Sequence, residues 1–323
     1  MSLLRRIRRR IRHDLGLSPS VGMAPRDQYF GPEDIERISE VYFQAGTESG
    51  TLWDKLRDAH MRLPDWFEHG LDPFGEAYAA QQHRLWQLIA GVERPYQPEV
   101  HEREQSWGDI DPVRQPGFLA RRDPAAVVAA SDHMIATGML LKHSQLKVGD
   151  WALEYGAGFG HTALTLARLG VNVDTVDISL AFCDFVRQQA SFFQVPLSAF
   201  HGRFGLNPRA GHKYRLIWFY ESFHHCLDFE NVVGQLAQHL EAGGRVILGG
   251  EPIVETENDA VPYPWGVRLH SEVVAVVRRQ HWFELGFSQA FLYRVFERAG
   301  FRGRRIDCDV SEFGRLYVFE RSV

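Results

Sequence analysis

Glycine recurs at every second position in one short segment, Glu154-Tyr155-Gly156-Ala157-Gly158-Phe159-Gly160. Glycines at this spacing let the backbone turn tightly and let a ligand approach without meeting a Cβ atom. The segment follows a short apolar run that predicts a strand, and a helical pattern follows it. Because ligands bind at such turns in parallel α/β sheets, the segment predicts a nucleotide-type binding loop.

An acidic residue, Asp177, ends the next predicted strand, 19 residues after Gly158. An acid at this spacing can accept hydrogen bonds from both hydroxyls of a ribose. The loop departs from the dinucleotide pattern GxGxxG, because His161 stands where the third glycine would be. It also begins with an acid, Glu154, which would repel a pyrophosphate and attract an ammonium group. The ligand predicted is therefore S-adenosylmethionine (SAM) and not a dinucleotide.

Polar side chains follow two later predicted strands, where the reaction site of a doubly wound sheet lies. Glu221, His224 and His225 come after the strand at 216–220, and Glu251 comes after the strand at 245–248. Transfer of a methyl group to a hydroxyl needs a base. Glu221 or His224 is the first candidate and Glu251 the next, whereas His225 could equally pack or cap a helix. No compact metal-ligand motif is present among them, so no metal is predicted.

Residues 252–286 form an insertion rich in aromatic, arginine and histidine side chains. Trp265, Arg268 and His270 are its candidate substrate-binding residues, because aromatic faces and such donors suit a sugar ring or another flat polar ligand. A lid with a small hydrophobic core explains the same pattern equally well.

Short apolar runs alternate with helical patterns from residue 149 onward, which predicts a mostly parallel sheet. The expected strands are 151–154, 171–177, 216–220 and 245–248, and the expected helices are 160–169, 179–193, 228–241 and 287–299. Two further strands, around 303–308 and 316–319, are joined by a short turn. The predicted fold class is therefore α/β, a doubly wound, mostly parallel sheet with a C-terminal antiparallel hairpin and an N-terminal helical extension.

Changes of composition along the chain predict three regions. Residues 1–31 form a basic amphipathic arm and a linker, and residues 32–146 form the helical extension or cap. Residues 147–323 form the catalytic domain, with 252–286 as a lid-like insertion.

Residues 147–323 resemble a class I SAM-dependent methyltransferase, whose fold is Rossmann-like. The first family motif matches Glu154, Gly156, Gly158 and Gly160, and the second matches Asp177. The segment from Ser222 to Asp228 resembles the block that follows strand four in the family. Departures are Arg215, where an acid usually opens strand four, and Ala242, where a proline is usual. The resemblance implies SAM as cofactor, held by Glu154, Gly156, Ala157, Gly158, Gly160, Asp177, Ile178, Arg203, Phe204 and Tyr220.

A finer resemblance lies in the segments 250–252, 263–266 and 284–287. They are similar to bacterial methyltransferases that accompany glycosyltransferases in surface-polysaccharide systems. This resemblance implies a glycan hydroxyl as acceptor and a role in polysaccharide biosynthesis. Two alternatives remain open: a small-molecule methyltransferase, and a non-catalytic interaction protein that has kept the SAM fold.

The charge of the chain is unevenly distributed. The 323 residues carry a net charge of −5, but residues 1–13 hold six arginines and no acid, which leaves 30 basic against 41 acidic residues elsewhere. Because the remainder of the chain is so acidic, we do not expect it to bind nucleic acid. Leu4, Ile7 and Ile11 share one helical face of the arm, so residues 1–15 are predicted to contact an anionic membrane surface; a solvated tail is the alternative.

The cysteine content and the arm also bear on location. Three widely spaced cysteines indicate a reducing compartment, and no secretory signal follows the basic arm. The expected location is the cytoplasm, with peripheral contact at the inner membrane face. The oligomeric state is not predicted.

Overall fold

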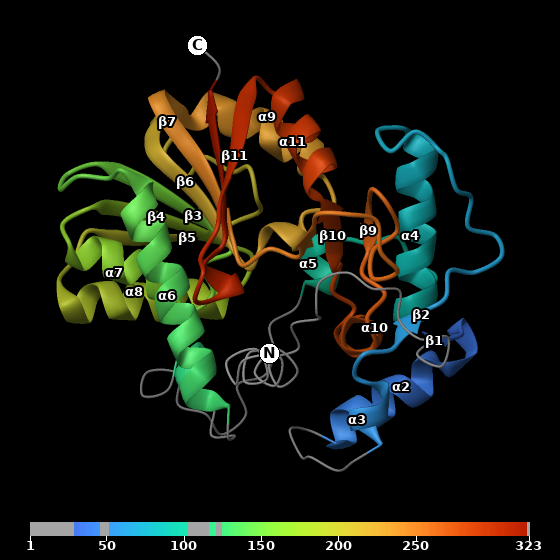
Figure 1. The fold of residues 1–323 in the computed structure, drawn as a ribbon. Helices are drawn as coiled ribbons and strands as arrows, with labels where there is room; N and C mark the ends of the chain where they lie inside the picture. Colours follow the sequence, from blue (N-terminus) through green and yellow to red (C-terminus); the bar gives the residue numbers. More distant parts are fainter. Residues whose placement is uncertain (1–28, 46–51, 103–115, 121–124, 322–323) are drawn as a thin grey trace. The chain divides into compact units, whose positions relative to one another are not determined.

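The computed structural model of the chain describes residues 29–45, 52–102, 116–120 and 125–321. The chain divides into two units (Figure 1). Unit 1 comprises Met1–Arg103 and Pro252–Phe291, and unit 2 comprises Glu104–Glu251 and Leu292–Val323. Nearly all of the predicted arm and linker, residues 1–28, lies outside the described residues.

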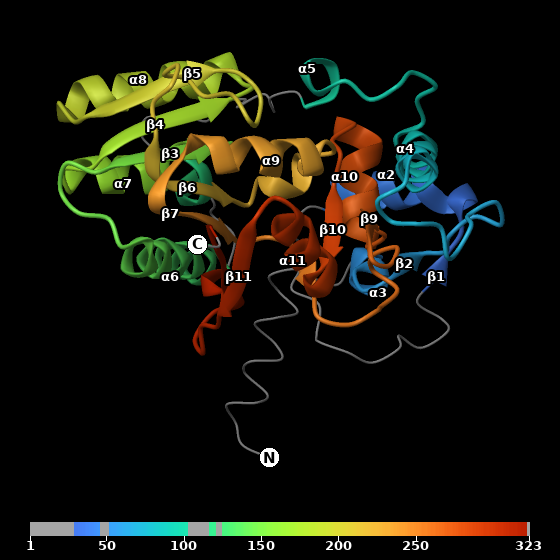
Figure 2. The same cartoon turned by 90° about the horizontal axis from the view of Figure 1, so that it is seen from above.

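Unit 2 is built on a seven-stranded sheet with the strand order β11-β12-β7-β6-β3-β4-β5, most of which can be followed across Figure 2. The strands are β3 (Trp151–Tyr155), β4 (Asn172–Asp177), β5 (Leu197–His201), β6 (Tyr214–Tyr220), β7 (Leu240–Gly249), β11 (Phe301–Ile306) and β12 (Leu316–Arg321). Strands β3 to β7 pair in parallel, and β12 is antiparallel to both β7 and β11. The predicted α/β fold with its closing hairpin is confirmed.

The middle of the sheet explains where a ligand can bind. Strand β6 reads YRLIWFY and is nearly continuously apolar, as expected of a parallel strand covered on both faces. Strand β3 pairs with β4 on one side and with β6 on the other. Tyr155 at the end of β3 pairs in register with Phe219 of β6. The glycine loop after β3 and the residues after β6 therefore leave the same edge of the sheet from neighbouring strands.

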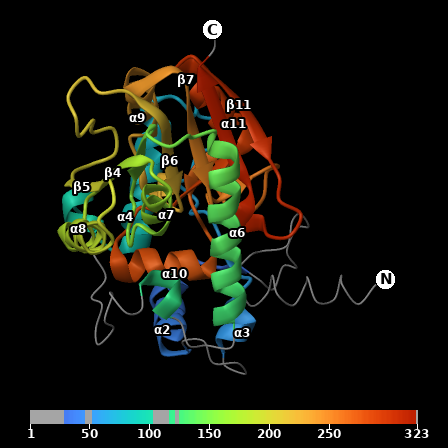
Figure 3. The same ribbon diagram turned by 90° about the vertical axis from the view of Figure 1, so that its left-hand side faces the viewer.

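Helices α6 (Ala126–Ser144), α7 (His161–Arg168) and α8 (Leu180–Phe193) cover one face of this sheet, and α6 is the long green helix in Figure 3. Leu140, Leu166 and Val186 of these helices share a buried cluster with Trp218 of the sheet. Ser179 fixes the start of α8, because its hydroxyl accepts the N–H of Phe182 at 3.0 Å.

Helices α9 (Phe229–His239) and α11 (Gln289–Arg298) carry aromatic and aliphatic side chains for the other part of the core. The ring of Phe296 stacks on Phe319 of β12, with 3.6 Å between the ring centroids. Phe223, in the turn before α9, meets Phe219 of β6 edge-on. These contacts fix the backbone on which the residues after β6 stand.

Unit 1 joins two segments that are distant in the sequence, as Figure 1 shows with β9 beside α4. The N-terminal segment contributes β1 (Tyr29–Phe30), α2 (Ile35–Ala45), α3 (Trp53–Leu56), β2 (His60–Met61), α4 (Glu76–Ala90) and α5 (Pro98–His101). The second segment contributes β8 (Ile253–Val254), β9 (Trp265–Val267), α10 (Ser271–Gln280) and β10 (Leu285–Ser288). Strand β10 lies between β8 and β9 in a three-stranded sheet.

The predicted domain boundaries are wrong in two respects. The insertion 252–286, predicted as a part of the catalytic domain, shares one unit with the N-terminal segment. Tyr78 of α4 donates its hydroxyl hydrogen to the carbonyl of Trp265 at 2.6 Å, and the Trp86 indole donates to the carbonyl of Trp282 at 3.0 Å. Helix α6, assigned by the sequence to the extension, instead packs on the sheet of unit 2. Each segment buries its apolar residues against a partner that is far away in the sequence.

Candidate functional site

The glycine loop between β3 and α7 has the geometry expected of a binding loop. Gly156 and Gly158 have φ angles of +68° and +51°, which side chains rarely adopt. A Cβ atom at Gly156 would lie 2.6 Å from the Cβ of Ser222, so the loop is pressed against the residues after β6. A Cβ atom at Gly158 would meet nothing within 4 Å. The backbone at Gly158 is thus open to a ligand.

Asp177 meets this loop, as its spacing predicts. Its Oδ2 accepts the N–H of Gly158 at 2.9 Å, and its Oδ1 accepts the N–H of Ser179 at 2.8 Å. Two backbone donors therefore fix the carboxylate at the carboxyl end of β4. A carboxylate has about four acceptor positions, so it retains capacity for ribose hydroxyls.

Glu154 is almost fully buried in β3, and its Oε1 accepts the indole N–H of Trp218 at 2.7 Å. Its Oε2 accepts no hydrogen bond from any residue that the structure describes. Burial raises the pKa of Glu154 to about 8, although the Trp218 hydrogen bond opposes the shift. The carboxyl group is therefore largely protonated at neutral pH, which differs from the ionised acid assumed in the sequence analysis. A cation brought close to it would favour ionisation.

The other predicted cofactor residues are distributed along the same edge of the sheet. Ala157 and Gly160 lie in the glycine loop, and Ile178 directly follows Asp177. Phe204 is half-buried, and its ring meets Tyr155 and Phe219 edge-on at centroid distances of 6.1 and 5.5 Å.

Phe204 also lies against the glycine loop, because a Cβ atom at Gly156 would be 3.3 Å from its ring. Arg203, next to Phe204, is exposed. Phe204 is thus positioned beside the loop.

Three features at this edge of the sheet fit SAM. The backbone is open at Gly158, a fixed carboxylate stands at Asp177, and a buried acid with an unsatisfied oxygen stands at Glu154. A ligand with a ribose and an ammonium group matches this set of groups. The donor set is therefore compatible with the cofactor that the sequence predicts.

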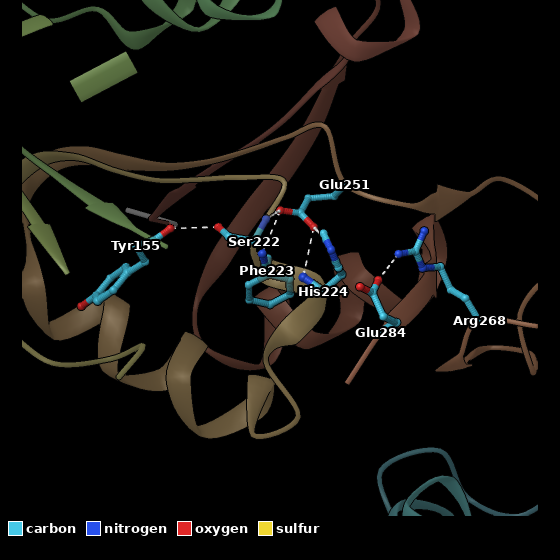
Figure 4. Close-up of polar contacts among 7 residues, drawn as sticks. All are labelled: Tyr155, Ser222, Phe223, His224, Glu251, Arg268 and Glu284. Carbon is cyan, nitrogen blue, oxygen red and sulfur yellow. Dashed lines mark hydrogen bonds and ion pairs between the residues drawn. The ribbon is translucent and has the colours of Figure 1, made fainter. Parts of the chain in front are cut away.

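Glu251 organises the residues that follow β6 (Figure 4). Its carboxylate accepts the backbone N–H groups of Ser222, Phe223 and His224 at 2.9, 2.8 and 3.1 Å. These residues begin the 3-10 turn η4 (Phe223–His225). The Ser222 hydroxyl donates in addition to the carbonyl of Tyr155 at 2.8 Å, which ties the turn to the end of β3.

The Glu251 carboxylate also contacts the imidazole of His224. Nδ1 of His224 lies 2.8 Å from Oε2 of Glu251, and the Glu251 side chain is only 1% exposed. Burial alone would raise the pKa of Glu251, but His224 and the backbone donors outweigh it and hold that pKa below its usual value. A buried carboxylate with these four polar contacts is a poor base. Glu251 therefore orients His224, and His224 is the better candidate of the two for proton transfer.

Glu221 and Tyr220 meet a histidine that the sequence analysis did not identify. Nδ1 of His133, on α6, lies 2.8 Å from the Tyr220 hydroxyl and 3.5 Å from Oε2 of Glu221. Burial, followed by Glu221 and other nearby acids, raises the pKa of Tyr220, so its hydroxyl stays protonated. The one signal in the sequence was a histidine within an otherwise Ala- and Met-rich helix.

The substrate residues predicted in the insertion belong to unit 1. Trp265 is 2% exposed, and its indole N–H donates to the carbonyl of Pro73 at 2.8 Å. The prediction that Trp265 offers a ring to a substrate is wrong, because the ring packs between Tyr78 and Phe291. At this position the structure agrees with the alternative prediction, in which the aromatic residues form a small hydrophobic core.

Arg268 and His270 are also engaged within unit 1. The Arg268 guanidinium is bonded to Glu284, as Figure 4 shows. His270 lies 4.5 Å from His60, measured between ring centroids, and burial lowers its pKa to about 3. His270 thus contacts the N-terminal segment of unit 1, whereas Arg268 is paired within the second segment.

Residues 152–244 match a family described as a methyltransferase domain. The match spans β3 to β7 and includes the glycine loop, Asp177 and His224. It confirms the prediction that the chain is a SAM-dependent methyltransferase, since this family implies use of SAM. No curated protein matches the chain.

Many solved structures resemble the chain in part. The YcgJ protein of Bacillus subtilis is 19% identical, with 54% of this chain and 71% of that chain covered and a TM-score of 0.44. A sarcosine dimethylglycine methyltransferase described for Galdieria sulphuraria is 16% identical, covering 60% and 85%, with a TM-score of 0.45. An O-methyltransferase described for Nostoc punctiforme is also 16% identical, covering 60% and 58%, with a TM-score of 0.45.

Every helix in the described part of the chain is too short or too polar to cross a lipid bilayer.

Proposed function

We propose that this methyltransferase transfers the methyl group of SAM to a hydroxyl group, and that the acceptor is a glycan or another polar hydroxyl compound. The observation that carries the hydroxyl assignment is the His224–Glu251 pair after β6, with 2.8 Å between Nδ1 and Oε2. An alcohol is a weak nucleophile until it loses its proton, so a positioned base is the group that such a reaction needs.

The glycine loop and Asp177 are the residues that would hold the cofactor. Gly158 allows close approach to the backbone, and Asp177 is fixed to accept hydrogen bonds from a ribose. Bound SAM supplies an electrophilic methyl group on a sulfonium. The protein contributes position, since alignment of the acceptor with that methyl group supplies part of the rate enhancement.

Glu251 sets the tautomer of His224 in this proposal. Nδ1–H donates to Oε2 of Glu251, so Nε2 carries the lone pair that can accept a proton. The acceptor hydroxyl passes its proton to Nε2 while its oxygen forms the bond to the methyl carbon. SAM would supply the methyl carbon and keep the electron pair of the broken carbon–sulfur bond on sulfur, so the products would be a methyl ether, a neutral thioether and imidazolium on His224. The adjacent carboxylate stabilises that imidazolium.

The glycan acceptor rests on the resemblance of segments 250–252, 263–266 and 284–287 to methyltransferases of polysaccharide systems. The burial of Trp265 removes one ring that the sequence had offered for sugar binding. A small-molecule hydroxyl is the second candidate, because the same base would serve it. We propose a cytoplasmic location, because three widely spaced cysteines indicate a reducing compartment.

Transfer of labelled methyl from SAM to candidate glycans tests the base. His224→Ala should lower turnover by roughly 10²–10⁴-fold, the usual contribution of a positioned base, with SAM binding retained. Glu251→Gln should also lower turnover, because an amide cannot stabilise the imidazolium. His239→Ala is the control, since His239 is the last residue of α9 and is not among the residues that directly follow β6. Turnover within threefold of wild type in His224→Ala would overturn the proposed base.

A further inference from the structure

We propose that His133, Glu221 and the ring of Phe118 form the acceptor-binding subsite of this enzyme, and that its ligand is a hydroxylated ring. The proposal rests on the proposed function, because it assigns the place where that acceptor binds. The three residues come from α6, from the end of β6 and from the 3-10 turn η3 (Gly117–Ala120), all within unit 2.

The backbone at Glu221 is the first observation. Its φ angle is +50°, a left-handed conformation that is unfavourable for a residue with a side chain. Room for the side chain comes from Gly250, where a Cβ atom would lie 2.5 Å from Cγ of Glu221. Strain of this kind persists where surrounding structure enforces it, and it gathers at functional sites. The fold therefore directs the Glu221 carboxylate to a fixed position beside the end of β6.

The position of His133 beside Glu221 is the second observation. Its Nδ1 lies 3.5 Å from the Glu221 carboxylate and 2.8 Å from the Tyr220 hydroxyl. The side chains of His133 and Glu221 are 20% and 36% exposed. This pair, unlike Trp265, is therefore within reach of a ligand. Carboxylate and imidazole groups together accept and donate hydrogen bonds, which is what neighbouring hydroxyl groups require.

The packing of aromatic rings around His133 is the third observation. The Phe118 ring is nearly parallel to the His133 ring, with an interplanar angle of 7° and 4.6 Å between centroids. Phe118 also meets His161 at 4.6 Å, and Phe313 meets His133 at 5.3 Å. Phe118 is only half-buried, so this aromatic cluster offers apolar surface beside the polar pair. Such a combination suits a ring that carries C–H groups on its face and hydroxyls at its edge.

The glycine loop adjoins this cluster. His161 is the first residue of α7, directly after Gly160, and burial lowers its pKa to about 4, so its imidazole is neutral. A Cβ atom at Gly117 would lie 2.9 Å from Nε2 of His161 and 3.1 Å from the Phe159 ring. The turn η3 is thus pressed against the start of α7, which brings Phe118 to the cofactor end of the unit.

Saturation-transfer NMR on the full chain with bound S-adenosylhomocysteine tests the subsite. The probes are methyl glycosides of common hexoses, with glycerol as an acyclic polyol for comparison. We expect the ring protons of at least one glycoside to receive saturation, and glycerol to receive none. Glu221→Gln and His133→Gln should each reduce the ring signal at least fivefold. Phe118→Leu, which keeps the polar pair, should reduce it as well.

His143→Gln is the matched control, because His143 lies on the same helix and outside the cluster. Its ring signal should equal that of the wild type. Equal signals in all variants, or no ring signal from a wild type that binds S-adenosylhomocysteine, would overturn the subsite and leave the proposed function standing. Failure of the wild type to bind S-adenosylhomocysteine in calorimetry would instead overturn the proposed function.

Discussion

Three carboxylates at the edge of the sheet in unit 2 are held in different ways, and this determines what each can do. Asp177 accepts two backbone N–H groups and is fixed for a ligand, and Glu251 accepts three such groups and an imidazole. Glu154 accepts an indole N–H and is buried. Residue type alone does not distinguish these roles, because all three are acids in, or shortly after, strands of the same sheet.

Asp177→Ala should weaken SAM binding at least tenfold, which corresponds to about 1.4 kcal/mol. The reason is that the variant loses the acceptor for the ribose and the group that fixes the N–H of Gly158. Isothermal calorimetry with SAM and S-adenosylhomocysteine measures the effect. Asp184→Ala serves as control, because Asp184 is paired with Arg187 on the surface of α8. Unchanged affinity in Asp177→Ala, or a preference for NADH, would contradict the cofactor assignment.

Glu154→Gln should make stability less dependent on pH. The pKa of Glu154 is raised to about 8 in the folded state, against about 4.3 in an unfolded chain. Between these values the folded state holds a proton that the unfolded state has lost, so wild-type stability falls as pH rises toward 8. Glutamine keeps an oxygen for the Trp218 indole and does not titrate.

Urea unfolding of both proteins at pH 6 and pH 8 measures this effect. The advantage of Glu154→Gln over the wild type should grow by roughly 2–3 kcal/mol between the two pH values. An advantage that stays constant with pH would show that Glu154 is ionised in the folded protein.

At the scale of elements, alanine substitutions at two glycines distinguish the cost of backbone strain from the cost of a steric clash. Gly250 and Gly211 have similar φ angles, +68° and +74°. A Cβ atom at Gly250 would lie 2.5 Å from Cγ of Glu221, whereas one at Gly211 would meet nothing within 4 Å. Gly211→Ala should therefore cost only the left-handed conformation, about 1–2 kcal/mol. Gly250→Ala should cost at least 1 kcal/mol more, because Glu221 must move.

Chemical denaturation of the two alanine variants compares these costs. Gly250→Ala should also lower methyl transfer, since it displaces Glu221, whereas Gly211→Ala should not. Equal losses of stability in the two variants would mean that the segment around Gly250, after β7, shifts and accommodates the added methyl group without a clash.

The sequence predicts elements well where local pattern decides them. The buried strands β3, β4, β6 and β7 and the closing hairpin follow from apolar runs and a turn. Strand β5 was not predicted, because Leu197–His201 is a short edge strand with an alternating burial pattern. The meeting of Asp177 with Gly158 was predictable from their spacing, since parallel strands end at a common edge.

Contacts between distant segments are what the sequence does not reveal. Trp265 looks like a ligand-binding ring until its partners Tyr78 and Pro73, nearly 200 residues earlier, are known. His133 likewise gains its role only through Tyr220 and Glu221, which approach it from another element. The role of a side chain that depends on such packing can be assigned only once the structure is known.

At the scale of the whole molecule, charge is the dominant asymmetry. Six arginines lie within residues 1–13, whereas the remainder carries 30 basic and 41 acidic residues. The arm lies outside the described residues, so its role stays a prediction. We propose that residues 1–15 bring the enzyme to an anionic membrane surface, where an acidic body alone would be repelled. Such a location would suit an acceptor that is linked to lipid.

Vesicle sedimentation tests the arm. The full chain should pellet with anionic vesicles and remain in the supernatant with neutral vesicles, because each arginine near an anionic surface contributes about 1 kcal/mol. Binding should weaken as salt rises from 0.05 to 0.5 M, which shortens the screening length. A variant with Arg5, Arg6, Arg8, Arg9, Arg10 and Arg12 changed to Gln should lose binding, whereas Leu4→Ala should weaken it less. Equal recovery of the wild type and the six-fold variant in the supernatant would mean that the arm is a solvated tail.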